Sequence, residues 1–217
     1  MHQTSWGNES FAKTKVKPKK LSPGDTIGLV APGFAIKLEE LYLAVDTLEK
    51  MGFKTFYTDR IKGNYGYFSN TDEERAADLN EMFTNPDIDA ILCARGGYGC
   101  TRILGMLDYD AIEENPKALI GFSDITALSC ALWKMCEIPS FSGPVLMSDL
   151  VGKKPDPVTW DHALSLVTGK RVSGQLISEP FNLSHTTALV SGESCGRLMG
   201  GNLALICSLL GTRWLPD

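Results

Sequence analysis

Ser123 and Asp124 lie where a predicted strand passes directly into a predicted helix. The apolar run 118–122 is typical of a short buried strand, and the segment 124–136 has helical character. A tight turn between them would hold the Ser123 hydroxyl above the carboxyl end of a sheet and point the Asp124 N–H outward. This is the geometry of a nucleophile elbow, in which a serine attacks a carbonyl and backbone N–H groups bind the oxyanion. The alternative interpretation is a serine that only caps the helix.

A glycine-rich loop follows another predicted buried strand, residues 90–94. It contains Arg95, Gly96, Gly97, Tyr98 and Gly99. Three glycines in four positions suit a backbone that passes close to another group or adopts positive φ, and such a loop can bind an anion through its N–H groups. A tight turn between strand and helix is the alternative. Because parallel strands end at one edge of a sheet, this loop and Ser123 are expected to converge, which favours acyl transfer.

Six ordered blocks of sequence, from near Leu21 to the end of the chain, resemble the LD-carboxypeptidase family of serine peptidases. That family includes muramoyl-tetrapeptide LD-carboxypeptidases and microcin C immunity proteins. The blocks are residues 23–32, 71–80, 95–99, 121–126, 142–144 and 196–203. The resemblance implies that Ser123 is the nucleophile and that the N–H groups of Asp124 and of the glycine loop form the oxyanion hole, with Gly97 preferred to Gly96 in that loop. It also implies substrate contacts at Gly96 and Tyr98, and no metal or cofactor.

The same resemblance implies two further catalytic residues, a Glu and a His, on a C-terminal domain beyond the Gly-Gly-Asn-Leu block. The sequence ends at Asp217, shortly after that block, so neither position is present. Its three histidines, His2, His162 and His185, are interpreted as surface or capping residues rather than as a relocated base. A serine without a base is a poor nucleophile at neutral pH. The sequence is therefore interpreted as the N-terminal two-thirds of a peptidase, inactive by itself.

Composition and charge limit the classes of partner. The 217 residues are 43% hydrophobic with a formal net charge of −5, which disfavours nucleic acid as the main partner. No apolar run is long enough to span a bilayer, and the first twenty residues lack a signal-peptide core, so a cytoplasmic location is expected. The six cysteines have no metal-binding spacing and are expected to be reduced thiols, several of them buried. Cys100 has no histidine near it in sequence and is an unfavourable nucleophile.

Strand-like and helical segments alternate, which predicts an α/β fold: a parallel sheet with helices on both faces. The predicted strands are 26–31, 54–57, 90–94 and 119–122, with an extended segment at 139–146, and the predicted helices are 38–51, 73–83, 101–107 and 124–136. The resemblance narrows the sheet to a flavodoxin-like, class I glutamine amidotransferase-like type.

The predicted domain organisation has four parts. They are a disordered polar tail (1–20), the domain with the elbow (21–150), a connector (151–187) and the start of a smaller, mixed second domain (188–217). The connector is expected to contain a helix at 158–167 and a strand at 175–178. The second domain is expected to begin with strands at 188–191 and 197–199 and a helix at 202–210.

The predicted function is an LD-carboxypeptidase that releases terminal D-Ala from a muropeptide through an acyl-enzyme on Ser123, as a homodimer when full length. Two alternatives remain. One is a microcin-immunity-like hydrolase of aminoacyl-nucleotide amides, against which the segment 98–102 weighs. The other is a non-catalytic flavodoxin-like domain that binds a carboxylate or phosphate at the loops of Gly97 and Ser123.

Overall fold

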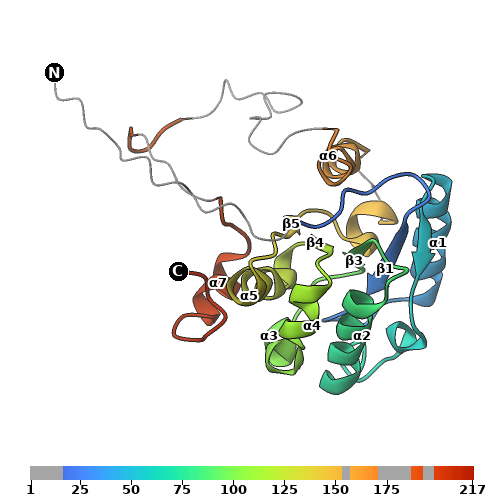
Figure 1. Ribbon diagram of the computed structural model, residues 1–217, viewed down its shortest axis with the longest axis horizontal. Coiled ribbons are helices and arrows are strands. Elements are labelled where there is room, and N and C mark those ends of the chain that lie inside the picture. The colour runs from blue at the N-terminus through green and yellow to red at the C-terminus, as the bar shows by residue number, and fades with distance from the viewer. Residues whose placement is uncertain (1–16, 153–156, 171–186, 193–197) are drawn as a thin grey trace.

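A five-stranded parallel sheet forms the centre of the molecule (Figure 1). The computed structural model describes residues 17–152, 157–170, 187–192 and 198–217. The strand order is β2-β1-β3-β4-β5, and every neighbouring pair is parallel. The strands are β1 (Thr26–Val30), β2 (Lys54–Phe56), β3 (Ala90–Cys93), β4 (Ala118–Gly121) and β5 (Phe141–Ser142). The predicted α/β class is therefore confirmed: β1, β2 and β3 begin where expected and end one residue early, and β4 lies one residue before the predicted 119–122.

Helices lie between the strands along the chain and after the last strand. Those between the strands are α1 (Leu38–Lys50), α2 (Asp72–Thr84), α3 (Cys100–Ile103), α4 (Tyr109–Glu114) and α5 (Thr126–Cys136), and those after the last strand are α6 (Pro157–Val167) and α7 (Leu203–Ser208). Short 3₁₀ turns lie at Asp59–Lys62, Leu104–Met106 and Ser123–Ile125, and a π-helical turn lies at Leu146–Leu150. Helix α4 and the π-helical turn were not predicted. The helix expected at 101–107 is instead a short α-helix followed by a 3₁₀ turn.

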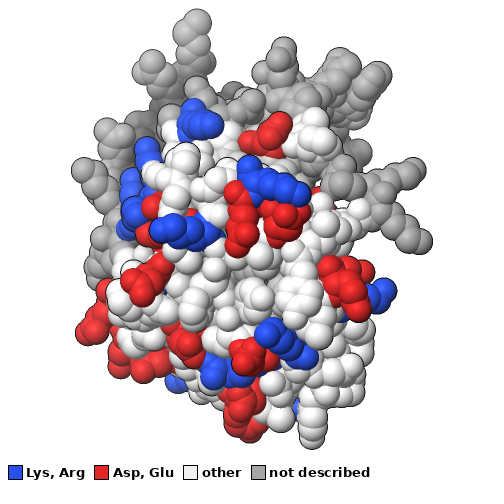
Figure 2. Space-filling view, turned by 90° about the vertical axis from the view of Figure 1, so that its right-hand side faces the viewer, with Lys and Arg blue, Asp and Glu red and all other residues white. Residues whose placement is uncertain are grey.

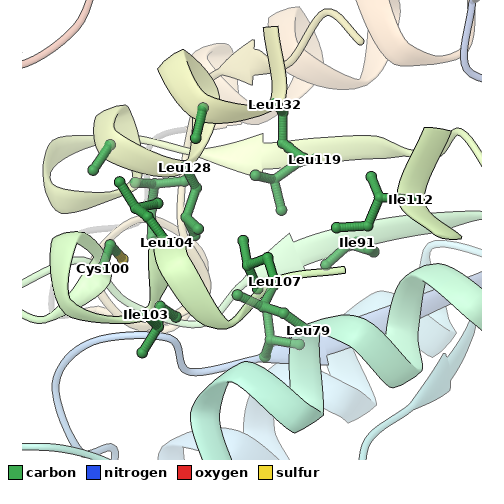
Figure 3. Packing of buried hydrophobic residues seen from close by; sticks show 14 of the residues in the cluster. Leu79, Ile91, Cys100, Ile103, Leu104, Leu107, Ile112, Leu119, Leu128 and Leu132 are labelled. Carbon is green, nitrogen blue, oxygen red and sulfur yellow. The ribbon is translucent and has the colours of Figure 1, made fainter. Parts of the chain in front are cut away.

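The centre of the sheet is buried on both faces, because residues of β1, β3 and β4 enter two different hydrophobic clusters. In β3, Ile91 packs with α2, α3 and α5, whereas Leu92 packs with α1 and α6. Figure 3 shows the first cluster, in which Leu79, Ile91, Leu119 and Leu128 approach one another from α2, β3, β4 and α5. This double burial explains why the strands are continuous apolar runs rather than alternating ones.

The chain beyond α6 differs from the sequence-based expectation. Helix α6 begins one residue before the predicted start, and α7 lies inside the predicted helix 202–210 with Asn202 as its N-cap. The strand predicted at 188–191 is not formed, nor do residues 198–199 form one. A strand needs a hydrogen-bonded neighbour, whereas the side chains of Leu189 and Val190 are almost fully exposed. The strand predicted at 175–178, Arg197 and residues 1–16 of the predicted tail lie outside the described residues.

Charged side chains of both signs are interleaved on the surface that contains α1 and α2 (Figure 2). Ion pairs on this surface include Lys50 with Asp46 and Lys62 with Asp59. At the end of the predicted tail, Lys19 pairs with Asp25 and Asp89. Among the residues described, no helix has the length and apolar character needed to cross a membrane.

Candidate active site

Three loops that leave neighbouring strands meet at Ser123. They contain Gly33 after β1, Gly96 after β3 and the turn after β4. A Cβ atom added to Gly96 would lie 3.1 Å from Ser123 Cβ and 3.4 Å from the Asp124 nitrogen. A Cβ on Gly33 would lie 2.9 Å from the Gly96 carbonyl oxygen and 3.0 Å from Asp124 Oδ2. The loops are thus in contact with little room for side chains, which confirms that the glycine loop and Ser123 share one edge of the sheet.

Ser123 has the backbone conformation expected of an elbow. Its φ is +64°, and Glu137 is the other non-glycine residue with positive φ in the described part of the chain. Strand β4 ends at Gly121, and the 3₁₀ turn Ser123–Ile125 leads directly into α5. Phe122, rather than Ser123, occupies the N-cap position of that turn. A positive φ is costly for a residue with a side chain and is common at functional sites, so a simple N-cap does not account for this conformation.

An open pocket of about 440 Å³ lies in front of Ser123, which is half-buried. Its lining consists of Phe122, Ser123, Ser142, Gly201 and Asn202. Ser142 is the last residue of β5, and the other two distant residues come from the segment just before α7. The pocket therefore combines the elbow with segments that lie up to 79 positions away in the sequence.

The segment before α7 is fixed against the elbow. The Asn202 N–H donates a hydrogen bond to Thr126 Oγ1 at 2.9 Å, and a Cβ on Gly201 would lie 2.5 Å from Thr126 Cγ2. The Asn202 side chain accepts hydrogen bonds from Ala204 and Leu205 and so caps α7. The sequence predicted the helix but not these contacts. In the sequence, only a capping Asn preceded by two glycines could have indicated a close approach of this segment to another part of the chain.

The glycine loop contains two residues with positive φ. Gly97 and Gly99 have φ of +107° and +140°, and a Cβ on Gly97 would lie 2.7 Å from Phe34 Cβ. Within the described part of the chain, the Gly97 N–H donates to no protein acceptor. Gly96 is buried against the elbow, whereas the Tyr98 side chain is half-exposed and its ring centroid lies 6.2 Å from that of Phe68. The oxyanion-hole role of Gly97 and the substrate contacts of Gly96 and Tyr98 stay predictions.

The Asp124 carboxylate connects the elbow to the glycine loop. Asp124 is fully buried, and its Oδ2 accepts a hydrogen bond from the Cys100 N–H at 2.9 Å. Its Oδ1 has no hydrogen-bond partner among the described residues. Burial, together with the Asp124 charge, raises the pKa of the Cys100 thiol well above its ordinary value. Cys100 is therefore buried and protonated, which disfavours it as a nucleophile. The sequence pattern pointed to the Asp124 N–H alone, and the contact made by its carboxylate was not predicted.

Arg75 holds the other side of the same loop. Its guanidinium is almost fully buried and donates hydrogen bonds to the carbonyl oxygens of Gly99, at 3.1 Å, and Pro32. It also forms an ion pair with Asp72 and lies 4.8 Å from the centroid of the Phe68 ring. Buried charges of this kind persist when they are paired and hydrogen-bonded. The loop is thus fixed on one side by Asp124 and on the other by Arg75.

The histidines and cysteines lie away from the pocket in front of Ser123 wherever the structure describes them. His162 is half-buried on α6 and does not line the pocket, while His2 and His185 lie outside the described residues. Cys93, Cys100, Cys130 and Cys136 are buried free thiols, and Cys207 is an exposed one. In the regions that the structure describes, no group of three or more His, Cys, Asp or Glu side chains could hold a metal ion.

Known proteins are similar to this chain in both sequence and fold. Residues 27–143 match the LD-carboxypeptidase N-terminal domain. A probable murein peptide carboxypeptidase of Bacillus subtilis is 37% identical over 206 residues, which cover 93% of this chain and 61% of the relative. This chain therefore spans about three-fifths of that curated relative's length.

Solved structures agree with the sequence match. An MccF-like protein from Bacillus anthracis has a TM-score of 0.79 at 28% identity, covering 93% of this chain and 67% of that one. A muramoyltetrapeptide carboxypeptidase from Oxalobacter formigenes has a TM-score of 0.68 at 30% identity, covering 88% and 62%. The chain belongs to the LD-carboxypeptidase family, of which it contains the N-terminal domain.

Proposed function

We propose that this chain carries the nucleophile and oxyanion site of a serine LD-carboxypeptidase, which releases D-Ala from a muropeptide tetrapeptide. The observation that carries the proposal is the positive φ of Ser123, which lines the pocket and lies where three loops converge. Family membership supports the same chemistry, since the relatives are described as carboxypeptidases of murein peptides. The strand order 2-1-3-4-5 supports a flavodoxin-like sheet, whose ligands bind at the carboxyl ends of the strands.

The proposed reaction is acyl transfer in two steps. Ser123 Oγ attacks the carbonyl carbon of the bond before D-Ala, and a base takes the hydroxyl proton. The N–H groups of Asp124 and Gly97 stabilise the resulting oxyanion. Collapse of this intermediate transfers the proton to the leaving amine and releases D-Ala. Water then hydrolyses the ester on Ser123 through a second oxyanion and regenerates the serine.

The base for this reaction is proposed to lie beyond the Gly-Gly-Asn-Leu block, on a second domain that residues 188–217 begin. The pocket lining within the described residues contains no histidine or acidic side chain. General-base assistance contributes on the order of a hundred- to ten-thousand-fold, so the 217 residues alone should show residual turnover only. A version extended by the C-terminal domain of a relative should regain the full rate.

Release of D-Ala from a muropeptide tetrapeptide tests the proposal. The extended version should release D-Ala, Ser123→Ala should abolish release, and Ser148→Ala should not change it. Ser148 is a suitable control because its exposed hydroxyl lies outside the pocket lining and hydrogen-bonds Asp149. Release that survives Ser123→Ala would contradict the proposal.

Hydrolysis of aminoacyl-nucleotide amides at the same serine is the second candidate. The similarity to the MccF-like structure supports it, because its TM-score of 0.79 exceeds the 0.68 of the muramoyltetrapeptide carboxypeptidase. Comparing the turnover of an aminoacyl-nucleotide amide with that of the muropeptide tetrapeptide distinguishes the two candidates.

A further inference from the structure

Arg95 is an exposed cation in the glycine loop that packs against the elbow. It follows the last residues of β3 and precedes Gly96, the residue that packs against Ser123. Its guanidinium carbon lies 4.2 Å from the centroid of the Phe34 ring. Phe34 in turn packs against Gly97. The guanidinium is thus held on the same loop that supplies the proposed oxyanion hole.

The three arginines near this loop have different partners. Arg75 and Arg102 both form ion pairs with Asp72, and both lie over the Phe68 ring. Arg95, by contrast, has no carboxylate within ion-pair distance in the part of the chain that the structure describes. Its charge is balanced there by the face of an aromatic ring alone.

A stacked guanidinium suits the recognition of a carboxylate. Cation–π contact occupies the flat face of the group and leaves its N–H edges for hydrogen bonds. The Phe34 ring is itself supported by Tyr67, with ring centroids 4.4 Å apart in an edge-to-face arrangement. The Arg95 guanidinium is therefore held in place before a ligand arrives, which lowers the entropic cost of binding.

We propose that Arg95 binds the terminal α-carboxylate of the peptide whose bond Ser123 attacks. This inference rests on the proposed function and names the group that makes the site an exopeptidase site. An arginine fork binds a carboxylate through two parallel hydrogen bonds. A peptide without that terminal charge would leave the fork unpaired, so binding would select for chains that end at the residue after the scissile bond.

Calorimetric binding of two peptides to the 217-residue chain tests the role of Arg95. The probes are a muropeptide tetrapeptide ending in free D-Ala and the same peptide with a terminal amide. The chain should bind the acid about ten- to a hundredfold more tightly than the amide, as expected for hydrogen bonds to a charged group. Arg95→Ala should remove this preference, and Arg95→Lys should keep part of it.

Arg213→Ala is the matched control, because Arg213 is also exposed and lies over an aromatic ring, that of Trp214, outside the pocket lining. It should leave the preference for the acid unchanged. An equal preference in Arg95→Ala, or no preference in the wild-type chain, would overturn the inference. Neither result concerns Ser123, whose role is tested separately by D-Ala release.

Discussion

Ser123 adopts a backbone conformation that is energetically unfavourable for a residue with a side chain. Its φ of +64° costs about 1–2 kcal/mol for a residue with a Cβ atom, whereas glycine adopts it freely. A serine kept at such a position suggests that the hydroxyl matters more than the strain. The stability of this position and its chemistry can therefore be tested separately.

Replacing Ser123 with Gly should relieve this strain, whereas replacing it with Ala should leave the strain in place. Both variants lack the hydroxyl, but only Ser123→Gly relieves the positive φ. Its free energy of unfolding in urea should exceed that of Ser123→Ala by about 1 kcal/mol. Equal stability of the two variants would show that the turn is not strained.

The carboxylate of Asp124 is expected to fix the glycine loop. Asp124→Ala removes the acceptor of the Cys100 N–H, whereas Asp124→Asn retains a side-chain oxygen in the same place. Hydrogen exchange of the Cys100 amide should therefore accelerate by about tenfold in Asp124→Ala and much less in Asp124→Asn. Unchanged exchange in Asp124→Ala would contradict this role.

At this scale the sequence could predict the strained serine but not the side chains that support it. A strand running straight into a helix indicates an elbow from local sequence alone. The contacts of Asp124 with Cys100, and of Arg75 with Gly99, join residues 24 positions apart. Such pairs depend on how neighbouring strands bring their loops together, which no local pattern encodes.

Helix α2 is joined to the 3₁₀ turn Asp59–Lys62 by a buried acid. Asp78 is almost fully buried, accepts a hydrogen bond from Thr58 Oγ1 at 2.5 Å and lies 3.5 Å from Arg60 Nε. Burial raises its pKa from 3.8 to about 6, in spite of these partners. The contact between α2 and this 3₁₀ turn should therefore be weaker when Asp78 is ionised.

Stability should reflect this pKa between about pH 4 and pH 6. There the folded chain keeps the Asp78 proton that the unfolded chain has lost, so stability falls as the pH rises through this window. Asp78→Asn keeps an acceptor for Thr58 and removes the charge. Relative to wild type, its free energy of unfolding should rise by about 1–3 kcal/mol from pH 4 to pH 7.

Glu74→Gln is the control for that experiment, because Glu74 also faces Arg60 but its side chain is 49% exposed. It should leave the pH dependence close to that of wild type. If Asp78→Asn and wild type have parallel stability curves from pH 4 to pH 7, Asp78 is ionised throughout and the assignment is wrong.

The sequence predicted elements best where a continuous apolar run or a helical spacing of apolar residues was clear. Helix α1 and strands β1, β3 and β4 lie within one or two residues of their expected bounds. Helix α4 was missed because it has only six residues, too few to show a helical period. The strand expected at 188–191 was inferred from local sequence, but a strand also requires a neighbouring edge, which local sequence does not supply.

Over the whole molecule, exposed apolar side chains gather toward the C-terminal end. The described residues between positions 187 and 210 expose Leu189, Val190, Leu198, Leu203 and Leu210, each by at least 66%. Surfaces of this kind usually pack against something. The second domain and the homodimer expected from the family resemblance stay predictions, and this surface is where they would form contacts.

The 217-residue chain should consequently self-associate as its concentration rises. Size-exclusion chromatography with light scattering should detect species larger than 23.7 kDa. A variant with Leu189→Ser, Leu198→Ser and Leu203→Ser should shift toward the monomer. A wild-type chain that stays monomeric at all concentrations would contradict this expectation.

Covalent labelling by a fluorophosphonate is the most direct test of the central claim that Ser123 is the nucleophile. In a version extended by a relative's C-terminal domain, mass spectrometry should find one adduct, on Ser123, and Ser123→Ala should form none. The 217-residue chain should react far more slowly, because it lacks the proposed base. An adduct on another residue, or equal labelling of Ser123→Ala, would contradict the account.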